Sequence, residues 1–373
     1  MNTKHKKLSI GVIFGGKSAE HEVSLQSAKN VIGAIDKNKY EVVLIGIDKK
    51  GRWYLNEGSK FFLHTNSPKL IKLDKANKEV ALVPTKQGTG QLVNISSHGS
   101  GGRITKRIDV IFPVLHGPFG EDGTIQGLLK LANIPFVGAG VLGSAIGMDK
   151  DVMKRLFKNA GIPIPKFLIF NQISRDKINF KKVIDYLGRP FFVKPANLGS
   201  SVGINKVGNE KQFKNAIKEA FKYDNKILIE EYIKGREIEC SVLGNNNPIA
   251  SVPGEIILHS EFYSYKAKYI DENGAVLKIP AKLPAEVVKK VKHLAIKAFK
   301  TLCCQGMARV DFFLRNNNEV VVNEINTIPG FTKISMYPKL WEASGISYTE
   351  LIDRLIQLAL ERFEQEKKLK TSL

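Results

Sequence analysis

Cysteine is scarce in this chain, and a long apolar run is missing from it. The 373 residues include three cysteines, Cys240, Cys303 and Cys304, and no histidine spacing beside them suits zinc. A disulfide scaffold is not expected in a chain this long, so all three are predicted to be reduced residues of the core. No apolar run approaches the roughly 20 residues that span a bilayer, which argues against a transmembrane protein.

The N-terminus also lacks the features of a secretory signal. Residues 1–7 are basic, but the apolar segment after them, residues 8–14, stops at Gly15 and Gly16. A segment this short, with no plausible cleavage site, is not a signal peptide. We therefore expect a cytoplasmic protein.

Acidic residues are few compared with basic ones. The chain has 36 Asp and Glu against 57 Lys and Arg, a formal net charge of +21, which could indicate nucleic-acid binding. The lysines are scattered, however, and no basic arm, zinc finger or RNA-recognition motif is present. We favour a general lysine bias that partly serves an anionic substrate such as a nucleoside triphosphate.

The most informative segment that is present is an expected β-hairpin. Residues 310–314 form an apolar strand, the three asparagines at 316–318 predict a turn, and a second strand begins at Val320. Asp311, Glu324 and Asn326 are spaced as Asp-x12-Glu-x-Asn on this hairpin. Alternate strand residues face the same side, so the three side chains can meet. Hard oxygen ligands of this kind suit Mg²⁺, although a polar end to a surface hairpin is an equal alternative from these residues alone.

The remaining elements predict α/β and α+β architecture. Residues 8–14, 40–48 and 108–115 are typical of buried strands, and residues 24–35 of a helix, which together predict an open parallel sheet. Residues 50–107 are less regular, and we expect added sheet and surface there. Further on, the pattern predicts helices over 149–159, 213–221, 285–302 and 348–366 and strands over 191–194, 204–207, 227–233 and 237–243.

A loop rich in glycine and serine, Asn197–Gly203, separates two of the expected strands. Small residues allow backbone amides and hydroxyl groups to approach phosphate oxygens closely. Lys194 lies just before this loop on an apolar strand, where it needs a partner or an anionic ligand. Taken alone, the loop is weak evidence, because a flexible hairpin turn has the same composition. Lys150, at the start of the preceding helix, is by itself better explained as a solvated residue.

The order of these features resembles the ATP-grasp superfamily and, within it, the D-alanine–D-alanine ligase family. A lysine-bearing helix and strand precede the Gly/Ser loop, a glutamate-rich strand and the acidic hairpin. The more specific likenesses span almost the whole chain: GGKSAEHEVS at 15–24, LHGPFGEDGTIQG at 115–127, GSSVG at 199–203, YKAKY at 265–269 and NEINTIPG at 323–330.

This resemblance implies a fold, an activity and cofactors. The fold is an ATP-grasp fold with an N-terminal open parallel α/β (Rossmann-like) domain over 1–138 and two ATP-clasping domains over 139–232 and 233–373. The activity is ATP-dependent ligation of two D-alanine molecules through an acyl phosphate, for peptidoglycan precursor synthesis. ATP as co-substrate, two Mg²⁺ or Mn²⁺ ions and a homodimer are implied as well, with no nucleic-acid or membrane partner.

The resemblance also places substrate and catalytic roles. Glu20 would bind the ammonium group of the first D-alanine with His116 nearby, Ser335 would hold the carboxylate of the second, and Arg309 and the Gly330 amide would stabilise the oxyanion. Each has a plainer alternative from the residues alone. Glu20 is a carboxylate favoured at a helix N-terminus, His116 a structural histidine, Ser335 an exposed loop serine, and Arg309 an ion-pair partner of the hairpin carboxylate Glu324.

A polar, tyrosine-rich segment over residues 263–269 is predicted to be a lid, because an acyl phosphate must be shielded from water. By the resemblance, Lys268 would reach the transferring phosphate, and Tyr269 would bond with Ser200 and Glu20. The full set implied for the nucleotide is Lys150, Lys194, Ser200, Ser201, Glu230, Glu231, Ile233, Glu237, Lys268 and Asn323, and the set implied for metal is Asp311, Glu324 and Asn326.

Several alternatives stay open at this point. A ligase of the same superfamily could take D-serine or D-lactate as its second substrate, and Tyr269 argues only against D-lactate. A basic nucleic-acid binder would show binding that weakens steeply with salt and needs no nucleotide. An inactive regulator is disfavoured because every motif position is filled.

Overall fold

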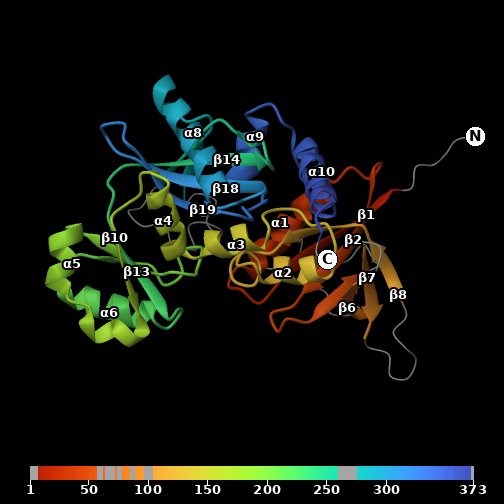
Figure 1. Cartoon of the computed structure of the whole chain (residues 1–373), viewed down its shortest axis with the longest axis horizontal. Helices are drawn as coiled ribbons and strands as arrows, with labels where there is room; N and C mark the ends of the chain where they lie inside the picture. The colour runs from red at the N-terminus through yellow and green to blue at the C-terminus, as the bar shows by residue number, and fades with distance from the viewer. Residues whose placement is uncertain are drawn as a thin grey trace, which may run out of the picture.

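Three large sheets organise the chain, and each lies in a separate unit (Figure 1). The computed structural model describes residues 7–56, 62–63, 72–73, 78–84, 89–95, 104–258 and 275–370. Among these, no helix is long and apolar enough to cross a membrane. The central unit, with α5 and α6, lies at one end of the molecule and the N-terminal unit at the other (Figure 1).

The N-terminal unit contains a seven-stranded sheet in the order β8-β7-β6-β3-β2-β1-β9. Strand β1 pairs in parallel with β2 and β9, and the other strands pair antiparallel, so the expected parallel core is extended by strands from the irregular region 50–107. The elements are β1 Leu8–Gly15, α1 His21–Ala34, β2 Tyr40–Ile47, β3 Trp53–Asn56, β6 Lys78–Pro84, β7 Gly90–Asn94, β8 Ile104–Ile108, β9 Val110–Val114, α2 Thr124–Leu131 and α3 Val141–Met148, with a separate pair β4 Phe62–Leu63 and β5 Lys72–Leu73.

The central unit is a four-stranded antiparallel sheet in the order β10-β13-β11-β12. Helices α5 and α6 pack on it through a buried cluster that includes Phe191 and Phe213, whose rings meet edge to face at 5.6 Å. The elements are β10 Phe167–Asn171, the 3₁₀ helix η1 Gln172–Lys177, α5 Phe180–Leu187, β11 Phe191–Pro195, β12 Asn205–Val207, α6 Glu210–Ala220 and β13 Lys226–Glu231.

The C-terminal unit contains the third sheet, in the order β17-β16-β14-β18-β19 with β15 on β14. Its elements are β14 Arg236–Gly244, β15 Ile249–Ala250, β16 Gly254–Leu258, β17 Ala275–Lys278, α8 Ala285–Thr301, β18 Gly306–Leu314, β19 Val320–Asn326, α9 Met336–Glu342 and α10 Tyr348–Glu366. Helix α4, Lys150–Asn159, shares the buried core of this sheet and α8 through Met153 and Phe157. Helix α4 is therefore packed on the C-terminal unit, while its first residue, Lys150, contacts the central unit.

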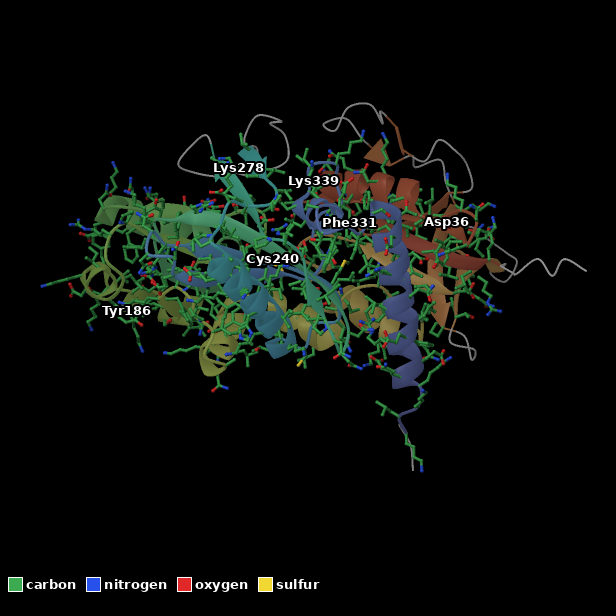
Figure 2. All side chains as sticks on the ribbon, turned by 90° about the horizontal axis from the view of Figure 1, so that it is seen from above. Asp36, Tyr186, Cys240, Lys278, Phe331 and Lys339 are labelled. Carbon is green, nitrogen blue, oxygen red and sulfur yellow. The ribbon has the colours of Figure 1, made fainter. Side chains whose placement is uncertain are left out.

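The N-terminal and C-terminal units share one core. Helix α10 lies between them, and its Leu355 belongs to the same buried cluster as Phe112 of β9 and Trp341 of α9. Phe331, labelled in Figure 2, lies at the centre of this cluster, with its ring 5.9 Å from that of Phe112 and stacked 6.3 Å from that of Tyr348. The loop that follows β19 is therefore anchored in the interior.

One expectation about cysteine is wrong. Cys240 and Cys304 are buried, with Cys240 in the middle of the C-terminal sheet (Figure 2), but Cys303 is exposed. The chain turns sharply after α8, where Cys303 adopts a positive φ of 53°. Because the turn directs neighbouring side chains to opposite sides, only Cys304 enters the core. All three cysteines are free, as expected.

Candidate active site

A cavity of about 430 Å³ lies between the central and C-terminal sheets. Every residue predicted to bind nucleotide in the described part of the chain lines it: Lys150, Lys194, Ser200, Ser201, Glu230, Glu231, Ile233, Glu237 and Asn323. Lys268 belongs to the lid segment, residues 263–269, which falls outside the described residues together with Tyr269. Four separate segments of chain thus meet at one hollow.

The inner wall of the cavity carries a buried cluster of charges. Lys194 of β11 pairs with one carboxylate oxygen of Glu230 on β13, and Lys154 of α4 lies 2.5 Å from the other. The two lysines hold the pKa of Glu230 low even though its burial would raise it. Burial lowers the pKa of Lys154, and Glu230 counteracts this shift. The Glu230 side chain is therefore occupied by lysines, and only the backbone of this strand is left for a base edge.

Lys150 also lines this cavity, between the Gly/Ser loop and the acidic hairpin. It is the first residue of α4, which Asp149 caps by accepting bonds from two backbone amides. Its ammonium group donates to the carbonyl of Leu198 at 2.7 Å and lies 3.4 Å from Glu324 Oε2. Lys150 thus joins the Gly/Ser loop to the acidic hairpin, at a place where phosphate would also be within reach.

The Gly/Ser loop bends through two unusual backbone conformations. Ser200 and Ser201 have positive φ values of 51° and 60°, a region that residues with a side chain rarely adopt. The Ser200 hydroxyl donates to Glu20 Oε1, across 180 positions of sequence. Glu20 itself precedes α1 but caps none of its amides. Its carboxylate is therefore directed to the Gly/Ser loop rather than to its own helix, and its contact with the first substrate stays a prediction.

A second carboxyl group lies beside Glu20 and was missed in the sequence. Glu121 accepts hydrogen bonds from the amides of Gly117, at 2.7 Å, and Ile328, at 3.1 Å. A Cβ atom on Gly117 would come within 2.6 Å of Glu20 Oε2, so both carboxyl groups flank this glycine. Burial and the Glu20 carboxylate raise the pKa of Glu121 to about 8. Glu121 is therefore mostly protonated at neutral pH.

We expect this raised pKa to make the protein less stable as the pH rises from about 5 to about 8. An unfolded glutamate releases its proton near pH 4.3, whereas folded Glu121 retains it up to about pH 8. The folded state binds more protons in this window, so the free energy of unfolding falls with pH, by at most about 1.4 kcal/mol per unit. The variant Glu121→Gln cannot ionise and should lack this part of the slope.

Urea unfolding of both proteins at about pH 5, 6.5 and 8 measures the difference. Glutamine offers a single acceptor to the amides of Gly117 and Ile328, so the variant loses one hydrogen bond at every pH. The diagnostic quantity is therefore how the difference in free energy of unfolding between the two proteins changes with pH. As the pH rises, this difference should shift in favour of the variant. Parallel curves would contradict the shifted pKa.

His116 is buried within the electrostatic influence of Glu20, and both of its ring nitrogens bond to protein atoms. Nδ1 lies 3.1 Å from the carbonyl oxygen of Ile328, and Nε2 lies 3.1 Å from the hydroxyl of Ser27. A carbonyl only accepts, so the proton is on Nδ1 and Nε2 accepts from Ser27. Burial lowers the pKa of His116 and keeps the ring neutral. The ring ties the loop before Gly330 to the N-terminal unit, and its predicted contact with substrate stays a prediction.

Arg309 lies between two carboxylates on neighbouring strands. Its guanidinium forms a bidentate pair with Asp311, at 2.7 and 2.8 Å, and its Nε lies 2.8 Å from Glu239 Oε2. Asp311 and Glu239 are directly opposite in the β14–β18 pairing, where like charges repel. The arginine offsets this repulsion, and it is held rigidly by two partners.

The hairpin has the predicted register. Asp311 is opposite Glu324, and Arg309 is opposite Asn326, whose amide nitrogen donates to Asp311 at 2.9 Å. Within the described ranges, no cluster of three or more His, Cys, Asp or Glu side chains could hold a metal. Two carboxylates and an amide oxygen are the smaller set that Mg²⁺ takes when phosphate supplies further ligands. The buried Oδ1 of neighbouring Asn323 has no hydrogen-bond partner, so the donors fit a cation bound together with nucleotide.

Gly330 and Ser335 are packed against each other. A Cβ atom on Gly330 would lie 2.7 Å from the Ser335 hydroxyl oxygen, so any other residue there would displace this serine. The same oxygen accepts the amide of Thr332 at 2.9 Å. The loop thus holds Ser335 at a fixed distance from the Gly330 backbone.

The residues that sequence reasoning missed had detectable signals. Lys154 is four residues after Lys150, which puts both on one face of α4. Glu239 is two residues after Glu237, which puts both on one face of β14. Glu121 is in the same glycine-rich motif as His116, but nothing in the sequence indicates its burial beside Glu20.

Two antiparallel sheets that enclose buried lysines, a Gly/Ser loop and an acidic hairpin define an ATP-grasp protein. Comparison with known families makes this assignment specific. The models "D-ala D-ala ligase N-terminus" and "D-ala D-ala ligase C-terminus" match residues 9–139 and 156–357. The chain belongs to the D-alanine–D-alanine ligase family and is an ATP-binding ligase.

Individual relatives agree over nearly the full length. The D-alanine–D-alanine ligase of Oceanobacillus iheyensis is 57% identical over 98% of this chain and 99% of its own. D-alanine–D-alanine ligase A of Escherichia coli K12 is 53% identical over 99% and 100%. Among solved structures, the ligase of Coxiella burnetii has a TM-score of 0.82 at 40% identity, covering 98% and 97%. The VanG D-Ala:D-Ser ligase of Enterococcus faecalis has the same TM-score at 39% identity, covering 95% and 100%.

Proposed function

We propose that this D-alanine–D-alanine ligase joins its two substrates through an acyl phosphate, to supply the dipeptide for peptidoglycan precursors. The observation that supports the proposal is the cavity between the two sheets. Its Ser200 donates a hydrogen bond to Glu20 on one side, and its Lys150 adjoins Glu324 of the acidic hairpin on the other. In a site of this shape, the nucleotide phosphates would lie next to the carboxylate of the first D-alanine.

The nucleotide would lie with its phosphates against Lys150, Lys194 and the amides of the Gly/Ser loop. The base would lie along the backbone of residues 230–233, with Glu237 at the ribose hydroxyls. Asp311, Glu324 and Asn326 would hold two Mg²⁺ or Mn²⁺ ions together with phosphate oxygens. When bound, these ions neutralise charge on the phosphates.

The two steps require positioning and charge stabilisation but no protein nucleophile. The carboxylate of the first D-alanine, anchored by its ammonium group on Glu20, attacks the γ-phosphorus, and ADP leaves. The amine of the second D-alanine then attacks the acyl carbon, loses a proton, and phosphate leaves. Arg309 and the Gly330 amide would stabilise the oxyanion of the intermediate between attack and departure.

The second substrate and the assembly complete the proposal. Ser335 would bind the carboxylate of the second D-alanine, and Lys268 and Tyr269 would close over the intermediate as part of the lid. Because the enzyme consumes ATP, we place it in the cytoplasm, and we expect a homodimer. Neither a nucleic acid nor a membrane enters this scheme.

Phosphate release from ATP and Mg²⁺ tests the proposal. D-alanine, L-alanine, D-serine and D-lactate are supplied singly, and D-alanine is then paired with each. We expect release with D-alanine alone, and D-alanyl-D-alanine by mass spectrometry. Release only in the mixed D-serine tube would move the specificity towards that of the VanG relative, and no stimulation by any of them would contradict the proposal.

A further inference from the structure

A buried lysine behind the cavity has none of these roles. Lys154 lies one helical turn beyond Lys150 on α4, and its residue is only 1% exposed. It does not line the cavity. A lysine is almost never this deeply buried without a specific partner, so its position requires a structural or functional reason.

Its contacts join three elements of two units. The ammonium group lies 2.5 Å from Glu230 Oε1 on β13 and donates to the backbone carbonyl of Asn323 on β19 at 3.0 Å. The other oxygen of Glu230 is taken by Lys194. Lys154 therefore connects the strand beneath the nucleotide cavity to the strand that carries the acidic hairpin.

The charges of this cluster do not balance. Lys154 and Lys194 share the Glu230 carboxylate. The nearby Glu324 carboxylate, which also acts on Lys154, is paired with Lys150. Three ammonium groups thus meet two carboxylates, which leaves one positive charge in a buried place, where an uncompensated charge is costly. Of the two lysines that share Glu230, Lys194 is the one that lines the cavity. Lys154 is paired with one of the two carboxylate oxygens of Glu230, so this carboxylate neutralises Lys194 only in part. The positive charge that remains on Lys194 faces the cavity.

We propose that Lys154 is a positioning residue for the nucleotide, which by sharing Glu230 leaves Lys194 charged towards the phosphates. Through the Asn323 carbonyl it also holds β19 against the same wall. This inference rests on the proposed nucleotide site and adds to it a residue that touches neither substrate nor metal.

The test compares Lys154→Met, Glu230→Gln and the double variant. Methionine keeps most of the unbranched side chain without its charge, and it leaves Lys194 paired with Glu230 as a neutral couple. We expect the KM for ATP to rise about tenfold, the effect of one lost charge-assisted contact, with little change in the KM for D-alanine. Glu230→Gln removes the carboxylate that partly neutralises Lys194, so its KM for ATP should not rise. In the double variant the carboxylate is gone as well, so the charge of Lys194 is no longer neutralised, and the KM for ATP should return towards the wild-type value.

Lys158→Met is the matched control, because Lys158 is exposed one turn further along the same helix. It should leave the KM for ATP unchanged. A purely structural Lys154 predicts a lower melting temperature without a selective rise in the KM for ATP, and a double variant worse than either single one. Either result would overturn the inference.

The wild-type enzyme separates this inference from the proposed function. If it releases no phosphate with ATP and D-alanine, the proposed function fails before any variant is compared. If it does, but Lys154→Met binds ATP normally, only the role of Lys154 fails. Should Lys154→Met not fold, the double variant decides: a KM for ATP near the wild-type value supports the inference, and one raised about tenfold or more contradicts it.

Discussion

Replacing Glu324 by glutamine should lower kcat by about 10³-fold or more while the fold is kept. The exchange removes one of the two hairpin carboxylates and leaves a side chain of the same size. The variant should therefore keep its packing but lose metal-assisted stabilisation of the transition-state charge, which is worth several kcal/mol. Glu324 is opposite Asp311 and 3.4 Å from Lys150, and Lys150 keeps its bond to the Leu198 carbonyl in the variant. Steady-state phosphate release at saturating ATP and D-alanine measures the effect.

Glu319→Gln provides the matched control on the same hairpin. Glu319 is 43% exposed in its side chain and lies 3.7 Å from Arg315, which is a surface pair of small energy. Its loss should leave kcat within about twofold. Circular dichroism and thermal melting of both variants exclude unfolding as the cause. Near-normal turnover by Glu324→Gln would remove the metal assignment from this hairpin.

The second large effect is expected at Arg309. Arg309→Lys keeps a positive charge between Glu239 and Asp311, so their mutual repulsion stays offset and the sheet should fold. The planar fork that meets Asp311 with two bonds is lost, however, and lysine cannot reproduce it. If the guanidinium stabilises the oxyanion, kcat should fall by about 10²- to 10³-fold.

The measurement is kcat and melting temperature together, with Arg315→Lys as the control. Arg315 is at the end of the same hairpin and contacts Glu319 and the cavity residue Glu231, but neither Arg309 nor the two carboxylates that Arg309 binds. At saturating ATP its loss should leave kcat unchanged. A variant at Arg309 that melts normally but turns over slowly would support the oxyanion role. Full activity in the lysine variant would assign Arg309 to the ion-pair network alone.

Local features were predictable because they depend on neighbouring residues. The hairpin follows from two apolar strands joined by asparagines, and strand pairing then sets Asp311 opposite Glu324. Helix α10 begins and ends where its apolar periodicity does. The cavity lining was also predicted, because each family motif carries its own residues, and the fold only had to bring the motifs together.

Features that depend on distant parts of the chain were not predictable from the residues alone. Cys303 and Cys304 are adjacent, and only the turn after α8 decides which one enters the core. Glu121 is one of several acidic residues in a glycine-rich loop until the fold buries it beside Glu20, which raises its pKa. His116 bonds to Ile328 and Ser27, neither of which any pattern around it indicates.

By itself, the sequence determined the hairpin, because spacing and alternation act over a few residues. It also determined the family and the set of residues around the cavity, because the motifs that carry the family resemblance can be read directly from it. The tertiary structure decided which of those side chains are free to bind. It turned the Glu230 carboxylate towards two lysines, brought Ser200 to Glu20, and placed Arg309 between Glu239 and Asp311. These are pairings of charged and polar groups over long sequence distances, and burial and electrostatics in the folded chain alone select them.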